Sequence, residues 1–137
     1  MNMKVIICLD DHDGLLFNNR RQSLDREIHR DMVKYTASSI LWMNEYTHKS
    51  FAALSVKCCV DNHFWELAKE DEFCFVEDGT IEPNLHRISE IVIYRWNRVY
   101  PSDVKFSTNA LANWHLVGSF SFPGHSHELI TREVYRR

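Results

Sequence analysis

Short apolar runs separated by polar turns divide the chain into predicted strands and helices. Continuous apolar runs are typical of strands that are buried on both faces, whereas apolar residues at three- and four-residue steps are typical of amphipathic helices. The continuous runs predict strands at residues 5–9, 40–43, 56–60, 73–76 and 91–100.

The clearest helical pattern covers residues 24–35, where apolar side chains recur at four- and three-residue steps. Ser23 is predicted to cap this helix, and Asp25 and Glu27 stand in its first turn, where the helix dipole favours acids. Residues 15–22 have no clear period and predict a loop. Shorter helices are predicted at residues 46–54, from 61 or 62 to 69, and near Pro83.

The last part of the chain predicts an antiparallel pair of strands, at residues 114–122 and 130–136. Strands that alternate with helices and then follow one another directly favour a three-layer α/β fold. Its central sheet is expected to be mostly parallel, with antiparallel C-terminal strands. A length of 137 residues predicts one domain, covering residues 1–137.

Composition narrows the functional classes. Hydrophobic residues make up 45% and charged residues 26%, as in ordinary globular proteins, and the formal net charge of −3 argues against a nucleic-acid partner. No apolar run approaches the ~20 residues of a membrane span, and the N-terminus does not have the pattern of a signal peptide. We therefore expect a cytoplasmic protein without a membrane partner.

The cysteines predict no metal site. None of the four stands in a C-x-x-C pair, and each lies in an apolar run. Reduced, buried thiols are the favoured interpretation. They are Cys8, Cys58, Cys59 and Cys74.

Several residues follow one another in the order and spacing of a known protein family. They are Asp10, Gly14, Asn18 or Asn19, Thr36, Met43, Trp114, Ser126, His127 and residues 133–137. With these residues the chain resembles a divergent, shortened member of the dihydrofolate reductase-like family, over most of its length. The resemblance implies the fold described above and a central cleft. In that family, the cleft serves NADPH-dependent reduction of a pterin.

The positions that would hold the cofactor differ from the family pattern. Glu77 and Asp78 stand where the family has a glycine pair beside the pyrophosphate, and Glu45 stands where it has an arginine for the ribose phosphate. Acids there would add like-charge repulsion to a steric clash. Thr47 and Gly79 are the remaining candidate cofactor contacts. The resemblance therefore implies no ordinary NADPH binding, and no cofactor is expected.

The substrate side is altered as well. The family's helix carboxylate aligns with Ile28, which leaves Glu27 beside it and Asp25 one turn away as candidates. A threonine that contacts this carboxylate in the family aligns with Arg95. Asp25, Glu27 and Arg95 are accordingly the candidate catalytic residues. We expect Arg95 to enter the cleft and pair with Glu27 or Asp25.

The most polar stretch, residues 18–26, predicts a ligand-binding loop at the mouth of the cleft. An ordinary solvated loop held by ion pairs explains the same residues equally well. The candidate ligand-binding residues are Asn18, Arg20, Arg21, Gln22 and Glu77. His125 and His127 are predicted to be turn histidines, and Trp96 to be packed in the core or at the edge of the sheet.

Three functions remain open at this stage. The first is a dihydrofolate reductase-like domain without ordinary NADPH binding that binds a small anionic metabolite in its central cleft. The second is an active NAD(P)H-dependent reductase of a pterin-like substrate, which would need NADPH. The third is a non-catalytic partner-binding module whose cleft is closed by side chains. The oligomeric state also stays open, with a homodimer among the alternatives.

Overall fold

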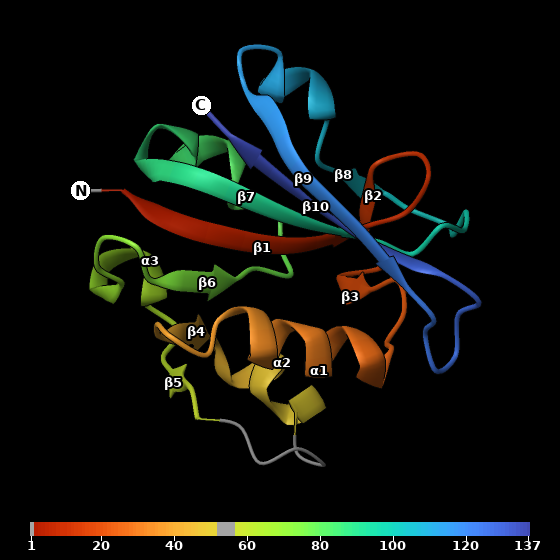
Figure 1. Cartoon of the computed structure of the whole chain (residues 1–137), viewed down its shortest axis with the longest axis horizontal. Helices are drawn as coiled ribbons and strands as arrows, with labels where there is room; N and C mark the ends of the chain where they lie inside the picture. The colour runs from red at the N-terminus through yellow and green to blue at the C-terminus, as the bar shows by residue number, and fades with distance from the viewer. Residues whose placement is uncertain (1, 52–56) are drawn as a thin grey trace.

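The structure is a computed structural model that describes residues 2–51 and 57–137 (Figure 1). A seven-stranded sheet forms its centre, in the order β5-β4-β6-β1-β7-β10-β9. These strands are β1 (Met3–Leu9), β4 (Leu41–Met43), β5 (Cys59–Val60), β6 (Phe73–Phe75), β7 (Ile88–Arg95), β9 (His115–Phe122) and β10 (Ile130–Arg136).

A second, three-stranded sheet has the order β3-β2-β8. It consists of β2 (Gly14–Phe17), β3 (Arg20–Arg21) and β8 (Val104–Lys105). The α-helices are α1 (Arg26–Tyr35), α2 (Glu45–His48) and α3 (Phe64–Leu67), and the 3-10 helices are η1 (Lys49–Phe51), η2 (Glu82–Arg87) and η3 (Thr108–Leu111).

The strand directions confirm the predicted fold class. Strands β5, β4, β6, β1 and β7 pair in parallel, and β10 joins β7 antiparallel. Val134 of β10 lies opposite Val92 of β7 on one side and Gly118 of β9 on the other. The predicted C-terminal pair is therefore present and belongs to the main sheet.

The central strand β1 is buried on both faces, as its continuous apolar run predicts. On one face, Val5, Ile7 and Leu9 join a core cluster that includes Phe106 and Trp114. On the other face, Ile6 contributes to a second cluster that packs beneath α1 and includes residues of β7 and β10. Figure 1 shows α1 and α2 together on this second side. The two clusters explain why the sheet forms the middle layer.

Two local predictions near the start of α1 are wrong. Asp25 rather than Ser23 is the N-cap, because its side chain accepts a hydrogen bond from the backbone of Glu27. The expected loop at residues 15–22 is instead the β2–β3 hairpin. Asn18 and Asn19 form its turn with φ of 52° and 59°, a left-handed conformation that asparagine tolerates well.

Some boundaries also differ from the predictions. Strand β7 begins at Ile88 and ends at Arg95, because Asn97 takes a left-handed conformation with φ of 57° soon after it. The predicted helix at 46–54 corresponds to α2 and η1. Its end and the start of the predicted strand at 56–60 lie outside the described residues. Helix α3 is only four residues long and follows His63.

The four cysteines are free thiols. Cys74 is buried, whereas Cys8, Cys58 and Cys59 are partly exposed, so full burial is confirmed for Cys74 alone. Across residues 2–51 and 57–137, no helix is long and apolar enough to cross a membrane. The same residues contain no group of three or more side chains arranged to hold a metal ion.

Candidate functional site

An ion pair fills the cleft between the β2–β3 hairpin and the main sheet. Arg21 belongs to β3, and Glu77 follows soon after the end of β6. The Arg21 Nε donates to Glu77 Oε2 and its Nη2 donates to Oε1, both at 2.8 Å. Thr47 Oγ1 donates to Glu77 Oε1 at 2.9 Å. A bidentate arginine–carboxylate pair of this kind is both strong and directional.

Little space is left around this pair. The Arg21 and Glu77 side chains are 17% and 9% exposed, and the guanidinium also lies over the Tyr46 ring at 4.4 Å. The remaining cavity has a volume of about 10 Å³, which is close to the minimum for one water molecule. It is lined by Cys8, Leu15, Arg21, Gln22, Val76, Glu77 and Trp96.

Arg95 lies away from this cleft, so its predicted pairing with Glu27 or Asp25 is wrong. Arg95 Nη1 contacts Asp13 Oδ1 at 2.7 Å, and its Nε contacts Glu133 Oε1 at 3.1 Å. Successive residues of a strand point to opposite faces of the sheet. Arg95 therefore faces away from α1.

Tyr94 has the orientation that was expected of Arg95. It is fully buried in the cluster beneath α1, and its hydroxyl donates to Asp31 Oδ2 at 2.6 Å. Burial and the neighbouring Asp31 carboxylate raise the pKa of the Tyr94 hydroxyl. Arg132 donates to the same Asp31 oxygen, also at 2.6 Å. A large, neutral, hydrogen-bonded side chain thus occupies this side of the cleft.

Asp25 lies in a tight backbone loop at the start of α1. Its carboxylate accepts hydrogen bonds from the backbone N–H groups of Glu27, His125, Ser126 and His127. Burial alone would raise the pKa of Asp25, but these donors and the His127 side chain lower it to about 2. Asp25 is thus a buried carboxylate that stays ionised.

His127 connects Asp25 to two hydroxyl groups. Its Nδ1 lies 3.0 Å from Asp25 Oδ2, and its Nε2 lies 2.6 Å from the Tyr100 hydroxyl and 3.3 Å from Ser23 Oγ. The imidazole stacks on Trp96 with ring centroids 4.7 Å apart. His127 lies in the turn between β9 and β10, as predicted, but its side chain is only 1% exposed.

Glu27, the other candidate carboxylate, takes no part in this cluster. It forms an ion pair with Arg30, one turn further along α1, at 3.2 Å. The pair lies on the surface of the helix, where the Glu27 side chain is 30% exposed and the Arg30 side chain is 55% exposed. Pairs of this kind contribute little to stability. Glu27 therefore lies outside the cluster that Asp25 and His127 form.

Four of the predicted ligand-binding residues do come together. Asn18, Arg20, Arg21 and Gln22 line a surface pocket of about 420 Å³, which we call the hairpin pocket. Glu77 does not line it, because it lies behind Arg21 in the closed cleft. The other lining residues are Phe17, Tyr100 and Pro101.

The polar side chains of the hairpin pocket differ in whether they are already paired. The Arg20 side chain makes no hydrogen bond or ion pair with the described part of the chain. Gln22 Nε2 donates to Asp10 Oδ2 at 3.1 Å and to the Pro101 carbonyl at 3.3 Å. The Gln22 Oε1 atom is buried and has no partner within residues 2–51 and 57–137. The pocket thus offers a cation, whereas the unpaired Gln22 Oε1 atom is buried and not exposed to the pocket.

The two candidate cofactor residues are not brought into one pocket. Thr47 is buried against Glu77, whereas Gly79 lines a separate pocket of about 300 Å³ near Val104. A Cβ atom at Gly79 would lie 3.5 Å from Val104, which is an ordinary contact. No close backbone approach therefore requires glycine at this position.

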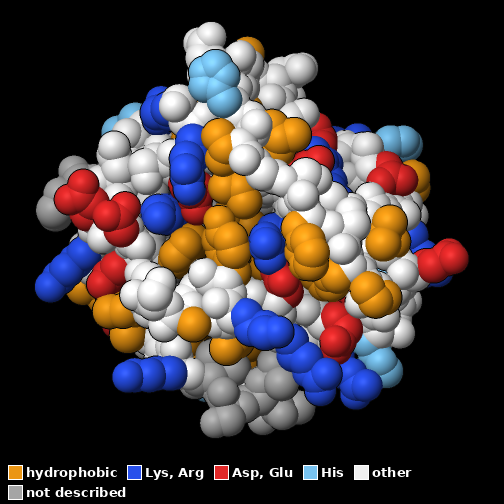
Figure 2. All heavy atoms as spheres, in the orientation of Figure 1, with side chains coloured by type: hydrophobic (Ala, Val, Ile, Leu, Met, Phe, Trp, Pro, Cys, Tyr) orange, Lys and Arg blue, Asp and Glu red, His pale blue; other side chains and the backbone are white. Residues whose placement is uncertain are grey.

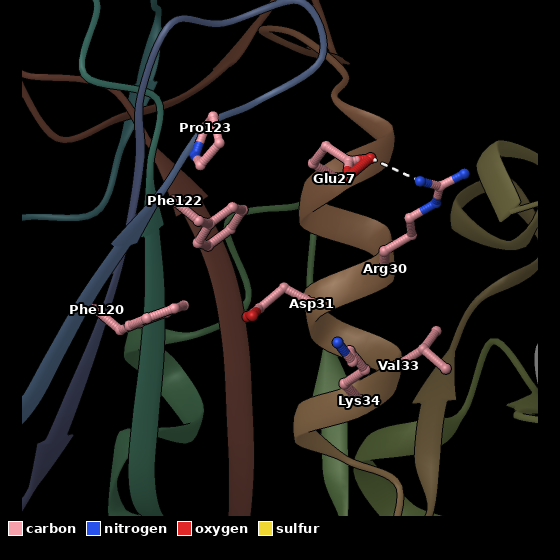
Figure 3. Close-up of a pocket in the computed structure, with 8 residues that line it drawn as sticks. All are labelled: Glu27, Arg30, Asp31, Val33, Lys34, Phe120, Phe122 and Pro123. Atoms are coloured by element: carbon pink, nitrogen blue, oxygen red, sulfur yellow. Dashed lines mark hydrogen bonds and ion pairs between the residues drawn. The ribbon is translucent and has the colours of Figure 1, made fainter.

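A further pocket was not predicted from the sequence. It has a volume of about 590 Å³ and lies between α1 and the end of β9 (Figure 3). Figure 3 shows that the α1 side carries the charged groups and that the other side carries apolar ones. The α1 residues are Glu27, Arg30, Asp31, Val33 and Lys34, and the opposite residues are Phe120, Phe122 and Pro123.

Comparison with known proteins identifies the fold. No protein-family model matches the sequence, and no curated protein matches it either. A solved structure of dihydrofolate reductase from Enterococcus faecalis, complexed with NADP(H) and RAB-propyl, matches 99% of this chain and 96% of that chain, with a TM-score of 0.67. The chain has a dihydrofolate reductase-like fold. At 9% sequence identity, the likeness concerns the fold alone.

Proposed function

We propose that this dihydrofolate reductase-like domain does not carry out NADPH-dependent reduction and instead binds a small anion in the hairpin pocket. One observation carries the proposal: both arginines of β3 line this pocket, but only Arg21 already has a carboxylate partner. Arg21 is held in the cleft by Glu77, while Arg20 lines the hairpin pocket without a partner among the described residues. Neighbouring residues of a strand point to opposite sides, which explains why Arg21 reaches Glu77 and Arg20 does not.

The closed cleft argues against dinucleotide binding. Glu77 and Asp78 carry two carboxylates where a pyrophosphate would need donors and close backbone approach. The Arg21 guanidinium is already neutralised by Glu77, and about 10 Å³ of space remains beside the pair. These residues do not fit a dinucleotide. The reductase alternative therefore draws its support from the fold alone.

The hairpin pocket supports binding of a small anion. Arg20 offers a planar guanidinium, which suits a carboxylate or a phosphate group. The proposed ligand class is thus a small carboxylic acid or a small phosphate. A volume of about 420 Å³ is in the range of small-molecule sites.

Thermal unfolding with added ligands tests this proposal. We expect inorganic phosphate and a set of small carboxylic acids to raise the unfolding temperature, and NADPH to leave it unchanged. A ligand at 100 times its dissociation constant adds about 2.7 kcal/mol to the free energy of unfolding. The effect should disappear in Arg20→Gln and persist in Arg26→Gln, a matched control because Arg26 is also exposed and lies outside the pocket. If both variants lose the ligand-induced rise in unfolding temperature to the same extent, the effect of charge is non-specific and the proposal is contradicted.

A second function, partner binding without catalysis, is favoured by a different observation. Strand β9 is the edge of the main sheet and carries exposed Leu116, Val117 and Phe120. In Figure 2, hydrophobic side chains gather across the middle of the face on which β9 and β10 cross the view in Figure 1. The eight residues of β9 include no Lys, Arg, Asp, Glu or Pro, which usually protect an exposed strand edge from pairing with another chain.

Light scattering tests whether β9 mediates self-association. If it does, the apparent mass should rise with protein concentration, and Val117→Lys should return the protein to the monomer mass. A constant monomer mass over the whole concentration range would exclude self-association through this edge.

A further inference from the structure

The cluster at the start of α1 contains groups that the proposed function does not use. We propose that Ser23 is a nucleophile, that His127 is its general base, and that Asp25 orients the base. Together they would cleave small esters that carry an anionic group. The anionic part of this substrate class rests on the proposed function of the hairpin pocket.

The order of contacts supports these roles. Asp25 Oδ2 lies 3.0 Å from His127 Nδ1, and Ser23 Oγ lies 3.3 Å from His127 Nε2. The ionised Asp25 selects the tautomer that carries its proton on Nδ1, which leaves the Nε2 lone pair directed at the hydroxyl groups. A nucleophile and its base are typically about 2.6–3.2 Å apart, and often further apart without substrate.

Burial of the cluster decreases from the acid to the nucleophile. The Asp25 side chain is 0% exposed and the His127 side chain 1% exposed, whereas Ser23 is partly exposed. The Trp96 ring stacks on the imidazole at an interplanar angle of 27° and fixes its plane. The base is therefore shielded from water, while the hydroxyl that would react stays near the surface.

Tyr100 competes with Ser23 for the same nitrogen. Its hydroxyl lies 2.6 Å from His127 Nε2, and a neutral imidazole offers one lone pair there. Tyr100 also lines the hairpin pocket. An anion that accepts a hydrogen bond from the Tyr100 hydroxyl would release Nε2 to Ser23. This contact links occupation of the pocket to activation of the serine.

Backbone donors for the developing oxyanion are available next to Ser23. The N–H groups of Leu24 and Arg26 make no hydrogen bond within the described part of the chain. They lie at the amino end of α1, a ten-residue helix whose dipole favours negative charge there. In other serine hydrolases, the residue that follows the nucleophile contributes one such donor.

The reaction balances with water as the second reactant. Ser23 Oγ attacks the ester carbonyl carbon, and its proton moves to His127 Nε2. The tetrahedral intermediate collapses, the C–O bond to the alcohol breaks, and Nε2 returns the proton to the leaving alkoxide. Water then attacks the acyl-serine by the same route, releases the carboxylic acid and restores the Ser23 hydroxyl.

A fluorophosphonate probe on the intact protein tests the nucleophile directly. Peptide mass spectrometry should locate the adduct on Ser23, and Ser23→Ala should abolish it. Ser126→Ala is the matched control, because Ser126 Oγ contacts Asp25 and His127 Nδ1 but not Nε2, so labelling should persist. Tyr100→Phe should label faster, because it removes the competing hydroxyl. A purely structural role of the cluster would predict no such acceleration.

Ester hydrolysis supplies the second readout. Ser23→Ala should lower the rate with p-nitrophenyl acetate by at least about 100-fold. The wild-type protein should prefer mono-p-nitrophenyl succinate, and Arg20→Gln should remove that preference. Labelling of Ser23 without the preference would overturn the anionic substrate class and the hairpin-pocket function, but not the nucleophile. A folded wild-type protein without an adduct on Ser23 would overturn the nucleophile itself.

Discussion

Arg21 and Glu77 form a bidentate ion pair that joins the β2–β3 hairpin to the end of β6, with both contacts at 2.8 Å. The two residues are 56 positions apart in the sequence, so the pair fixes a long-range contact. The cavity that remains beside this pair has a volume of only about 10 Å³. Burial lowers the pKa of the Arg21 guanidinium, but the Glu77 carboxylate outweighs this effect and raises it.

Glu77→Gln should destabilise the protein by about 2–4 kcal/mol, because it leaves a largely buried guanidinium without its charge partner. The measurement is urea unfolding at pH 7. Glu27→Gln removes the exposed pair with Arg30 and should cost less than about 0.5 kcal/mol. Arg21→Met combined with Glu77→Met should recover most of the loss. A cost for Glu77→Gln as small as that of the Glu27 control would contradict the buried ion pair.

Stability should fall in acid because of Asp25. Its pKa is about 2 in the folded protein, against an ordinary value of 3.8. The folded state therefore gains stability above pH ~4, and it loses this contribution as the pH falls through the folded pKa. The shift corresponds to about 2 kcal/mol. Urea unfolding between pH 6 and pH 2 should show the loss, and Asp25→Asn should flatten that part of the profile.

Gly124 should not tolerate a side chain. A Cβ atom there would lie 2.6 Å from Asp25 Oδ2 and 2.6 Å from the His127 carbonyl oxygen. Gly124→Ala should therefore cost about 1–3 kcal/mol through overpacking. Gly118→Ala is the matched control, because a Cβ there meets nothing within 4 Å. If both variants unfold at the same urea concentration, the close approach of this loop to Asp25 is wrong.

Arg95 should be energetically coupled to Asp13 and not to Asp25. A double-mutant cycle with Arg95→Met and Asp13→Asn should give a coupling energy of about 0.5–3 kcal/mol, because the two side chains are 2.7 Å apart. The cycle of Arg95→Met with Asp25→Asn should give a value near zero. The reverse result would restore the interpretation that places Arg95 in the cleft.

The sheet could be predicted from the sequence because its strands are short, continuous apolar runs, and this pattern favours a buried strand over a helix or a loop. β1 and β10 lie where the pattern places them, and the C-terminal antiparallel pair follows from two such runs. The direction of a single side chain was harder to predict. Arg95 differs from Tyr94 by one position, and a shift of one residue moves a strand side chain to the opposite face.

The polar clusters could not be predicted because they depend on tertiary contacts. His127 looked like a turn residue, since nothing local shows that its loop folds onto the start of α1. The left-handed Asn18–Asn19 pair was the one local signal for the β2–β3 hairpin, and such asparagines are typical of tight hairpin turns. The pairing of Arg21 with Glu77 rather than with a ligand follows from that hairpin.

The most direct test of the closed cleft is titration of the protein with NADPH while tryptophan fluorescence is recorded. Trp96 lines the small cavity beside Arg21 and Glu77, so a ligand in the cleft should quench it. We predict no saturable quenching up to about 1 mM NADPH, which corresponds to a binding free energy weaker than about −4 kcal/mol. Saturable quenching with micromolar affinity would contradict the closed cleft and favour a working reductase.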